Sequence, residues 1–217
     1  MIDIQNLSFK IAGKTILDSV DVAFEKSSLN AIIGPSGAGK STLLNLLMGL
    51  YKPSKGEILV NEIKLSSLKK NSRQKYRQNI GMVWQDFRLL PKKNVFENVK
   101  FALEVINFPK LEMEKAVLTA LEKVGLSHQI NAYPRELSGG EKQRCALARA
   151  IVHNPSILIC DEPTGNLDLK NAREVIELLY KVNKNNTTVI IVTHNVDLLD
   201  NFNGQVFLLE DSRLKLI

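Results

Sequence analysis

Short apolar runs, bounded by glycine, proline or polar residues, recur along the chain and predict strands. Apolar and polar residues alternate over 2–9 and 20–24, which is typical of half-buried strands. Residues 29–33 form an apolar run that ends at Gly34, as a buried parallel strand does. The remaining strands are expected at 58–60, 80–84, 157–160, 188–192 and, as a closing hairpin turned at Asp211–Ser212, at 206–209 and 214–216.

The middle of the chain shows a helical periodicity instead. Apolar residues recur at helical spacing over 95–106 and 111–124, and Pro109 separates the two predicted helices. Further helices are expected at 40–50, 66–78, 141–153 and 169–182. This order of segments predicts one α/β domain that carries a helical subdomain.

The boundaries of these parts follow from the change of periodicity. We expect residues 1–85 and 155–217 to form the β-rich core, and residues from about 86 to 154 to form the helical subdomain. The whole chain of 217 residues is long enough to bury one sizeable core.

Composition excludes several classes of protein. With 44% hydrophobic and 24% charged residues, the chain is neither disordered nor a coiled coil nor a disulfide scaffold. No apolar run approaches the roughly 18 residues of a membrane-spanning helix. Asp3, Gln5 and Asn6 stand where a signal peptide needs an apolar stretch, so we do not expect export. Cys145 and Cys160 are expected to be buried and reduced.

A glycine-rich turn between a predicted strand and a predicted helix is the first candidate site. Its residues Gly34-Pro35-Ser36-Gly37-Ala38-Gly39-Lys40-Ser41, followed by Thr42, match the phosphate-binding pattern GxxxxGK[ST]. Backbone N–H groups and the helix N-terminus would hold the phosphates of a nucleotide. Lys40 would reach the β- and γ-phosphates, and the Ser41 hydroxyl would hold Mg²⁺. The alternative, a turn that binds nothing, leaves all four fixed positions in this context unexplained.

Two carboxylates follow a predicted buried strand and fit the same chemistry. Asp161 and Glu162 come directly after the apolar run 157–160, at the strand end where ligands bind in open α/β sheets. Asp161 would hold Mg²⁺, and Glu162 would polarise an attacking water. Such a pair is commonly just solvated, and it is the phosphate-binding turn elsewhere in the chain that favours the functional interpretation.

A second glycine pair precedes a predicted helix at residues 137–141, Leu-Ser-Gly-Gly-Glu. Ser138 and Glu141 can form a capping box there, and the same helix start can bind an anion. This string is the signature of ABC-type ATPases, and the chain resembles that family from end to end. Gln85 stands at the position of the family's Q-loop, residues 165–168 at its D-loop, and His194 at its H-loop.

The resemblance implies a fold and a mode of action. The fold is a P-loop NTPase core of the RecA type with an antiparallel β subdomain and a helical subdomain, and the cofactors are ATP and Mg²⁺. Two domains stack head to tail as a homodimer, so that Ser138, Gly139 and Gly140 of one protomer close on the γ-phosphate held by the other. A lone subunit should therefore hydrolyse ATP poorly.

Four more residues receive roles from the resemblance. Gln85 senses Mg²⁺ and water and links the site to a partner protein. His194 contacts the γ-phosphate and steadies the water that Glu162 activates. Asp168 couples the two sites of the dimer. Many relatives stack adenine on an aromatic residue where this chain has Ile11, and Phe9, two residues earlier, is a candidate substitute.

Two stretches resemble the cell-division ATPases of that family. They are residues 84–91, Trp-Gln-Asp-Phe-Arg-Leu-Leu-Pro, and residues 95–99, Val-Phe-Glu-Asn-Val. This resemblance implies an FtsX-like integral membrane partner and a peripheral location on the inner face of the plasma membrane. Phe87, Leu89 and Leu90 either anchor that partner or simply pack the subdomain.

Other members of the family remain as alternatives. Residues 161–168 also suit the lipoprotein-release and macrolide-export ATPases. An ABC ATPase that works on nucleic acid is disfavoured, because fewer than 100 residues separate Lys40 from Leu137 and the chain has one P-loop.

The net charge of +6 is concentrated in one segment. Residues 63–93 hold nine Lys and Arg against Asp86 alone. The segment is either a solvated helix or a stripe that meets anionic lipid or an acidic partner. Nucleic acid is the least expected partner.

Overall fold

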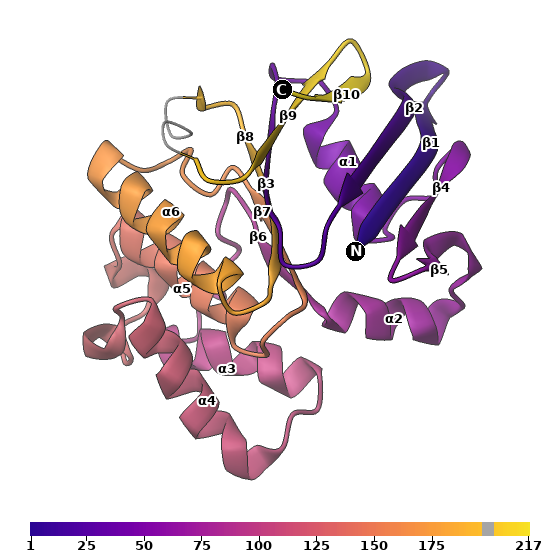
Figure 1. Ribbon diagram of the computed structural model, residues 1–217. Helices are drawn as coiled ribbons and strands as arrows, with labels where there is room; N and C mark the ends of the chain where they lie inside the picture. The colour runs from indigo at the N-terminus through magenta and orange to yellow at the C-terminus, as the bar shows by residue number, and fades with distance from the viewer. Residues whose placement is uncertain (197–201) are drawn as a thin grey trace.

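The computed structural model describes residues 1–196 and 202–217 as two sheets with helices between and around them (Figure 1). The larger sheet has the strand order β10-β9-β3-β8-β7-β6. Its strands are β3 (Leu29–Ile33), β6 (Ile80–Val83), β7 (Ile157–Asp161), β8 (Thr188–Thr193), β9 (Gln205–Glu210) and β10 (Arg213–Leu216). All of these pairings are parallel except that of β9 with β10.

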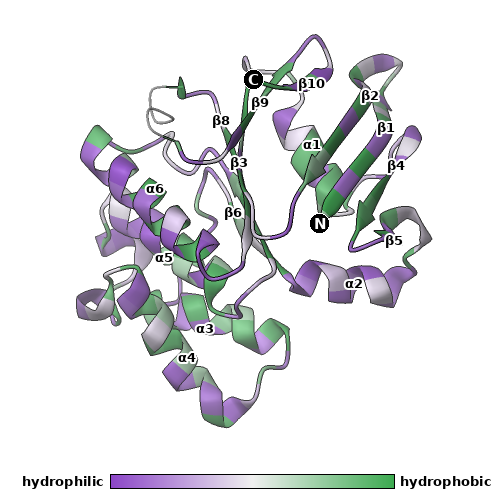
Figure 2. Ribbon diagram, viewed as in Figure 1, coloured by the Kyte–Doolittle hydropathy of each residue, from purple (hydrophilic) through white to green (hydrophobic). Residues whose placement is uncertain are grey.

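The smaller sheet is antiparallel and has the order β2-β1-β4-β5. Its strands are β1 (Ile2–Ile11), β2 (Lys14–Phe24), β4 (Lys55–Val60) and β5 (Ile63–Lys64). Helix α1 (Lys40–Leu47) lies between the two sheets, and Phe24, Leu43 and Phe207 belong to the hydrophobic cluster that joins all three layers. Hydrophobic residues accordingly follow these strands and α1 in Figure 2.

The other face of the larger sheet carries a second hydrophobic cluster. Helices α3 (Val95–Val105), α4 (Lys110–Lys123), α5 (Gly139–Ile151) and α6 (Leu169–Asn183) supply most of it. Val99, Leu121 and Leu147 are buried where α3, α4 and α5 pack together. The prediction of an α/β fold with an antiparallel β part and a helical part is therefore confirmed.

One predicted helix is shorter than the sequence suggested. Instead of a helix over 66–78, the chain forms a 3₁₀ turn at Leu65–Ser67 and then α2 (Lys70–Gln78). No residue of α2 is buried, and Figure 2 shows the helix as almost entirely hydrophilic. Its half-buried Tyr76 donates a hydrogen bond of 2.6 Å to the Leu47 carbonyl, which ties α2 to α1.

The helix predicted over 40–50 ends at Leu47, because Gly49 has a left-handed φ of 64°. Cys145 and Cys160 are buried and free, as predicted. None of the helices in the described part of the chain combines the length and the apolar composition that spanning a membrane requires.

Asn98 is a polar residue at the centre of this packing. It is fully buried in α3, where its amide donates to the carbonyls of Leu90, Lys93 and Asn94 and accepts from the Leu90 N–H. We expect Asn98→Ala to lower the free energy of unfolding by about 2–4 kcal/mol, because buried backbone groups lose their partners. Urea denaturation measures this. Asn71→Ala on exposed α2 is the control, and an equal effect of the two substitutions would contradict the prediction.

Candidate functional site

The glycine-rich turn connects β3 to α1 at the carboxyl ends of the parallel strands of the larger sheet. Gly39 stands at the N-cap of α1 with a φ of 106°, and no side chain caps the helix. A Cβ on Gly39 would lie 2.9 Å from the Ile16 side chain, and one on Gly34 would lie 2.2 Å from the Leu209 carbonyl oxygen. The turn therefore requires glycine at both positions, and the first N–H groups of α1 remain open to an anion.

Lys40 is folded back over the turn that precedes it. Its Nζ donates to the carbonyl oxygens of Gly34, at 2.8 Å, and Pro35, at 3.0 Å. The residue is 8% exposed, and among the described residues no carboxylate lies within 4.0 Å of its ammonium group. A buried cation held only by carbonyl dipoles fits a site that accepts phosphate.

Asp161 at the end of β7 reaches the start of α1. The Ser41 hydroxyl donates to Asp161 Oδ2 over 3.3 Å. Burial raises the pKa of the Asp161 carboxyl, and the hydrogen bond from Ser41 opposes the shift. A carboxylate and a hydroxyl oxygen side by side are the ligands that Mg²⁺ prefers.

A cavity of about 700 Å³ opens beside this pair. It is lined by Ser41, Asn45, Leu50, Trp84, Gln85, Asp86, Arg88, Asp161 and Asn166. The structure thus brings the three predicted magnesium residues, Ser41, Gln85 and Asp161, to one cavity. Hydroxyl, amide and carboxylate oxygens fit a hard cation that also keeps water and phosphate ligands.

Glu162 and His194 meet where β7 and β8 end. His194 Nδ1 lies 2.8 Å from Glu162 Oε1, and the His194 N–H donates to Glu162 Oε2 over 3.3 Å. Glu162 is 9% exposed and has a left-handed φ of 49°, and its N–H donates to the Val192 carbonyl. The backbone of Glu162 is strained, and its buried carboxylate lies against the His194 imidazole, an arrangement that suits proton transfer at the ends of β7 and β8.

The signature residues Ser138, Gly139 and Gly140 lie at the start of α5. Ser138 and Glu141 form the expected capping box, with the Ser138 N–H 2.8 Å from Glu141 Oε2. Hydrogen bonds from the Ser138 backbone and hydroxyl hold the pKa of Glu141 below its usual value. Neither Ser138 nor Gly139 nor Gly140 lines the cavity that contains Gln85 and Asp161.

Asp168 is engaged at the start of α6. Its carboxylate accepts the Asn171 N–H at 2.9 Å and the Asn171 side-chain amide at 2.6 Å, and these bonds lower the pKa of Asp168. The carbonyl oxygen of the Asn171 side chain would lie 2.3 Å from a Cβ on Gly140. Asn171, which no motif in the sequence indicated, therefore contacts both Asp168 of the D-loop and Gly140 of the signature.

Ile11 and Phe9, the residues considered for adenine, both lie in β1. Ile11 is 48% exposed at the end of β1. Phe9 stacks on Tyr51, with ring centroids 5.4 Å apart and planes at 4°. Tyr51 follows the C-terminal end of α1, whereas the P-loop precedes its N-terminal end. One face of Phe9 is thus occupied, and the apolar side chains of Ile16 and Leu17 lie beside Gly39 of the P-loop.

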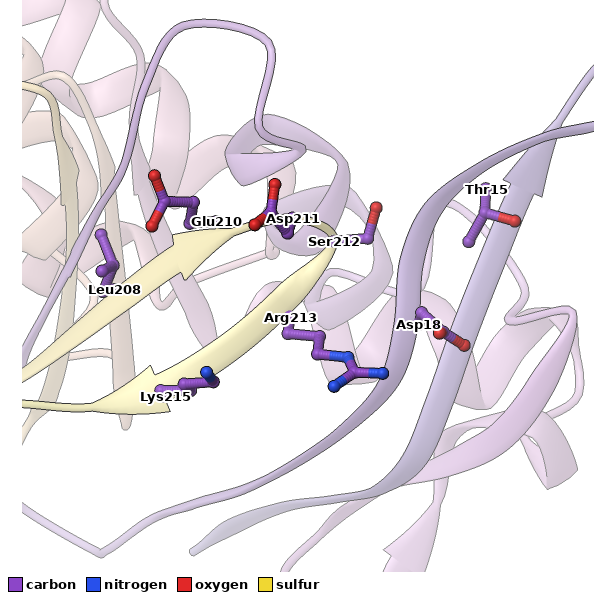
Figure 3. A pocket seen from close by; sticks show the side chains of 8 residues that line it. All are labelled: Thr15, Asp18, Leu208, Glu210, Asp211, Ser212, Arg213 and Lys215. Atoms are coloured by element: carbon purple, nitrogen blue, oxygen red, sulfur yellow. The ribbon is translucent and has the colours of Figure 1, made fainter.

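A separate hollow of about 490 Å³ lies between β2 and the β9–β10 hairpin (Figure 3). It is lined by Thr15, Asp18, Leu208, Glu210, Asp211, Ser212, Arg213 and Lys215. None of the predicted site residues lines it.

The comparisons with known proteins agree on one family. A sequence profile described as ABC transporter matches residues 17–165. The cell division ATP-binding protein FtsE of Streptococcus pneumoniae is 43% identical over 202 residues, which cover 93% of this chain and 88% of that protein. The methionine import ATP-binding protein MetN of Carboxydothermus hydrogenoformans is 40% identical over 218 residues, which cover 99% of this chain but 65% of that protein.

A solved structure is similar over almost the whole chain. It is the dimeric, post-hydrolysis state of the ATP-binding cassette MJ0796 bound to ADP and Pi. The TM-score is 0.88 at 33% sequence identity, and the match covers 99% of this chain and 97% of that one.

The geometry of Glu162 gives the first functional prediction. We expect Glu162→Gln to bind ATP with wild-type affinity and to lose hydrolysis, because the amide keeps the size of the side chain but cannot accept a proton. Fluorescent-nucleotide titration and phosphate release measure the two properties. In Lys40→Ala, by contrast, nucleotide binding should be lost. A wild-type hydrolysis rate in Glu162→Gln would show that the catalytic assignment is wrong.

The signature glycines give a prediction on stability. A Cβ on Gly140 would collide with Asn171, whereas one on Gly139 would have no neighbour closer than 3.6 Å. We expect Gly140→Ala to lower the free energy of unfolding by about 1–3 kcal/mol, as overpacking does. Gly139→Ala is the matched control and should be neutral or slightly stabilising in the same urea titration. Equal stability of the two variants would contradict the contact.

Proposed function

The chain belongs to the ABC transporter family and is an ATP-binding subunit with the ATPase domain of that family; from this premise we propose that it drives a membrane-associated complex in cell division. The 43% identity to FtsE supports this role. So does the stretch Trp84–Pro91, by which the chain resembles cell-division ATPases.

The observation that carries the catalytic proposal is the meeting of two residue pairs at one sheet edge. The Ser41 hydroxyl donates a hydrogen bond to Asp161, and Glu162 Oε1 lies 2.8 Å from His194 Nδ1. The P-loop and Lys40 bind the phosphates of ATP, and Glu162 takes a proton from the attacking water.

Gln85 joins these residues at that site, and each of them has a role in the proposal. His194 holds the Glu162 carboxylate and reaches the γ-phosphate. Ser41, Asp161 and Gln85 would hold Mg²⁺, which neutralises charge that develops on the phosphate oxygens.

The catalytic unit in this proposal is a homodimer. Ser138, Gly139 and Gly140 do not line the cavity that contains Ser41 and Asp161 of their own chain, which supports a role on the nucleotide of a second copy. The similar cassette MJ0796 is dimeric with ADP and Pi. In the dimer, Asp168 lies at the junction of the two sites, and residues from about 86 to 154 act as the helical subdomain beside the ATP-binding core.

An apolar groove beside the Q-loop supports a membrane partner. It has a volume of about 400 Å³ and is lined by Arg77, Gln78, Ile80, Gly81, Met82, Trp84, Arg88, Leu90, Phe101, Ala102, Val105, Ile106, Arg149, Ala150 and His153. Phe101 and Val105 are exposed there. Leu90 lines the groove, whereas Phe87 and Leu89 pack into the helical cluster.

We place an FtsX-like integral membrane protein at this groove and the chain at the inner face of the plasma membrane. Arg77 of α2 lines the groove, and no residue of α2 is buried, so the basic side chains of this helix suit anionic lipid or an acidic segment of the partner. Nucleic acid is not part of the proposal.

A second candidate is the ATPase of a methionine importer, which the identity to MetN favours. A lipoprotein-release or macrolide-export complex is a third, because of residues 161–168. These alternatives share the ATP site and differ in the membrane protein.

The decisive experiment identifies the membrane protein. Tagged Glu162→Gln is captured from membranes in Mg·ATP, and the bound integral proteins are identified by mass spectrometry, with Lys40→Ala as the control. We expect an FtsX-like protein to be enriched with Glu162→Gln. Enrichment of a methionine permease or of a lipoprotein-release permease instead would overturn the cell-division role.

A further inference from the structure

Arg149 in the last turn of α5 holds the backbone of the Q-loop. Its guanidinium donates to the carbonyl oxygen of Arg88 at 2.6 Å and to that of Phe87 at 2.7 Å. These contacts join residues 61 and 62 positions apart in the sequence. A single side chain from the signature helix thus grips two successive peptide units.

The two gripped residues have an unfavourable backbone conformation. Phe87 has a φ of 59° and Arg88 a φ of 47°, both left-handed. Such a conformation costs roughly 1 kcal/mol or more for each residue that is not glycine. It persists only where other contacts impose it, and the fork of donors on Arg149 is such a contact.

Arg149 has no acidic partner to explain its position. Among the described residues, no carboxylate lies within 4.0 Å of its guanidinium. Burial also lowers the pKa of Arg149. Within the described part of the chain, the side-chain hydrogen bonds of this half-buried cation go to the two carbonyls alone, so its position is explained by that backbone.

The far end of the same segment is fixed by a second residue. Asn98 of α3 holds both the N–H and the carbonyl of Leu90, together with the carbonyls of Lys93 and Asn94. Arg149 and Asn98 therefore attach residues 87–94 to the helical body formed by α3 and α5.

The near end of the segment contacts the ATP site. The Asn166 side chain donates to the Gln85 carbonyl over 3.2 Å, and Gln85 lines the cavity that contains Asp161. The Arg88 guanidinium lies 3.8 Å from the centre of the Trp84 ring. Only Trp84, Gln85 and Asp86 separate residues 87–94, which we call the braced segment, from β6.

We infer that Arg149 is a positioning residue that fixes the Q-loop to the signature helix, so that Gln85 and the signature move together. Helix α5 begins at Gly139 and ends at Ile151, a length of about 20 Å at 1.5 Å per residue. A displacement at Ser138 is transmitted along this helix to Phe87 and Arg88, and from there to Gln85. The functional part of this inference rests on the proposed role of Gln85 at the magnesium site.

Trp84 offers a direct readout, because it is the single tryptophan of the chain. It lies in the Q-loop and lines the cavity beside Ser41, and its ring is in cation–π contact with the Arg88 guanidinium. Its emission therefore reports the conformation of this segment and the arrival of Mg·ATP.

The test compares Arg149→Lys, Arg149→Met and the control Arg173→Met, which removes an exposed arginine of α6. A lysine keeps the charge but has one nitrogen for two carbonyls. We expect both Arg149 variants to change Trp84 emission while far-UV circular dichroism and the ATP dissociation constant stay at wild-type values. Turnover should fall by about tenfold to a hundredfold with the KM for ATP unchanged, as for a misplaced group.

Chemical rescue separates positioning from loss of structure. Methylguanidinium at millimolar concentration should restore Trp84 emission and turnover in Arg149→Ala, and should do nothing in Arg173→Ala. Wild-type emission and turnover in Arg149→Lys and Arg149→Met would overturn the inference. So would a loss of ATP affinity equal to the loss of turnover, which indicates general unfolding.

Gln85→Ala distinguishes this inference from the proposed function. If Gln85→Ala keeps wild-type turnover, the proposed role of Gln85 fails, while the change of Trp84 emission in the Arg149 variants still tests the brace. If Gln85→Ala is inactive and Trp84 emission is unchanged in the Arg149 variants, the inference that Arg149 positions the Q-loop is wrong, and the proposed role of Gln85 stands.

Discussion

The parallel register of β3, β8 and β7 is the constraint on which the site depends. Ile33 pairs with Thr193, and Val192 pairs with Asp161, so these strands end at the same level. The P-loop follows Ile33, and His194 follows Thr193, which brings groups from distant parts of the chain to one edge. Ser41 and Asp161, for example, are 120 residues apart in sequence and share a hydrogen bond. A slip of one residue would turn the buried side chains of a strand to the other face and separate these pairs.

Local patterns predicted most of the strands and the phosphate-binding turn, but β5 was not predicted and β2 begins at Lys14 rather than at residue 20. The run 29–33 followed by glycine has few alternatives, and Gly34 and Gly39 prove necessary because Leu209 and Ile16 occupy the space of a side chain. The strand that ends at Asp161 was predicted in the same way. What the sequence did not reveal are contacts between distant residues. Asn171 against Gly140, Arg149 on the Phe87 carbonyl and the bonds of Asn98 depend on packing that no local periodicity encodes.

One difference between the predicted and the observed elements has a simple physical cause. The helix predicted over 66–78 was inferred from polar composition alone. It starts later because Leu68 and Lys69 have an extended backbone, which separates the 3₁₀ turn from α2. Phe9 stays a candidate platform for adenine, and one face of its ring stacks on Tyr51, which follows the C-terminal end of α1. Four of the nine basic residues in segment 63–93 lie on α2, where no residue is buried. One of them, Arg77, lines the apolar groove beside the Q-loop.

The molecule therefore has a sheet edge that carries the phosphate-binding turn and a helical body that carries the signature, whose residues do not line the cavity beside that turn. In this account the site is completed only when the signature of a second copy meets the P-loop. Sedimentation velocity of Glu162→Gln tests this most directly. We predict a monomer without nucleotide, a dimer in Mg·ATP, and a monomer under both conditions when Lys40→Ala is added. A protein that stays monomeric in saturating ATP, or is equally dimeric without it, would contradict the account.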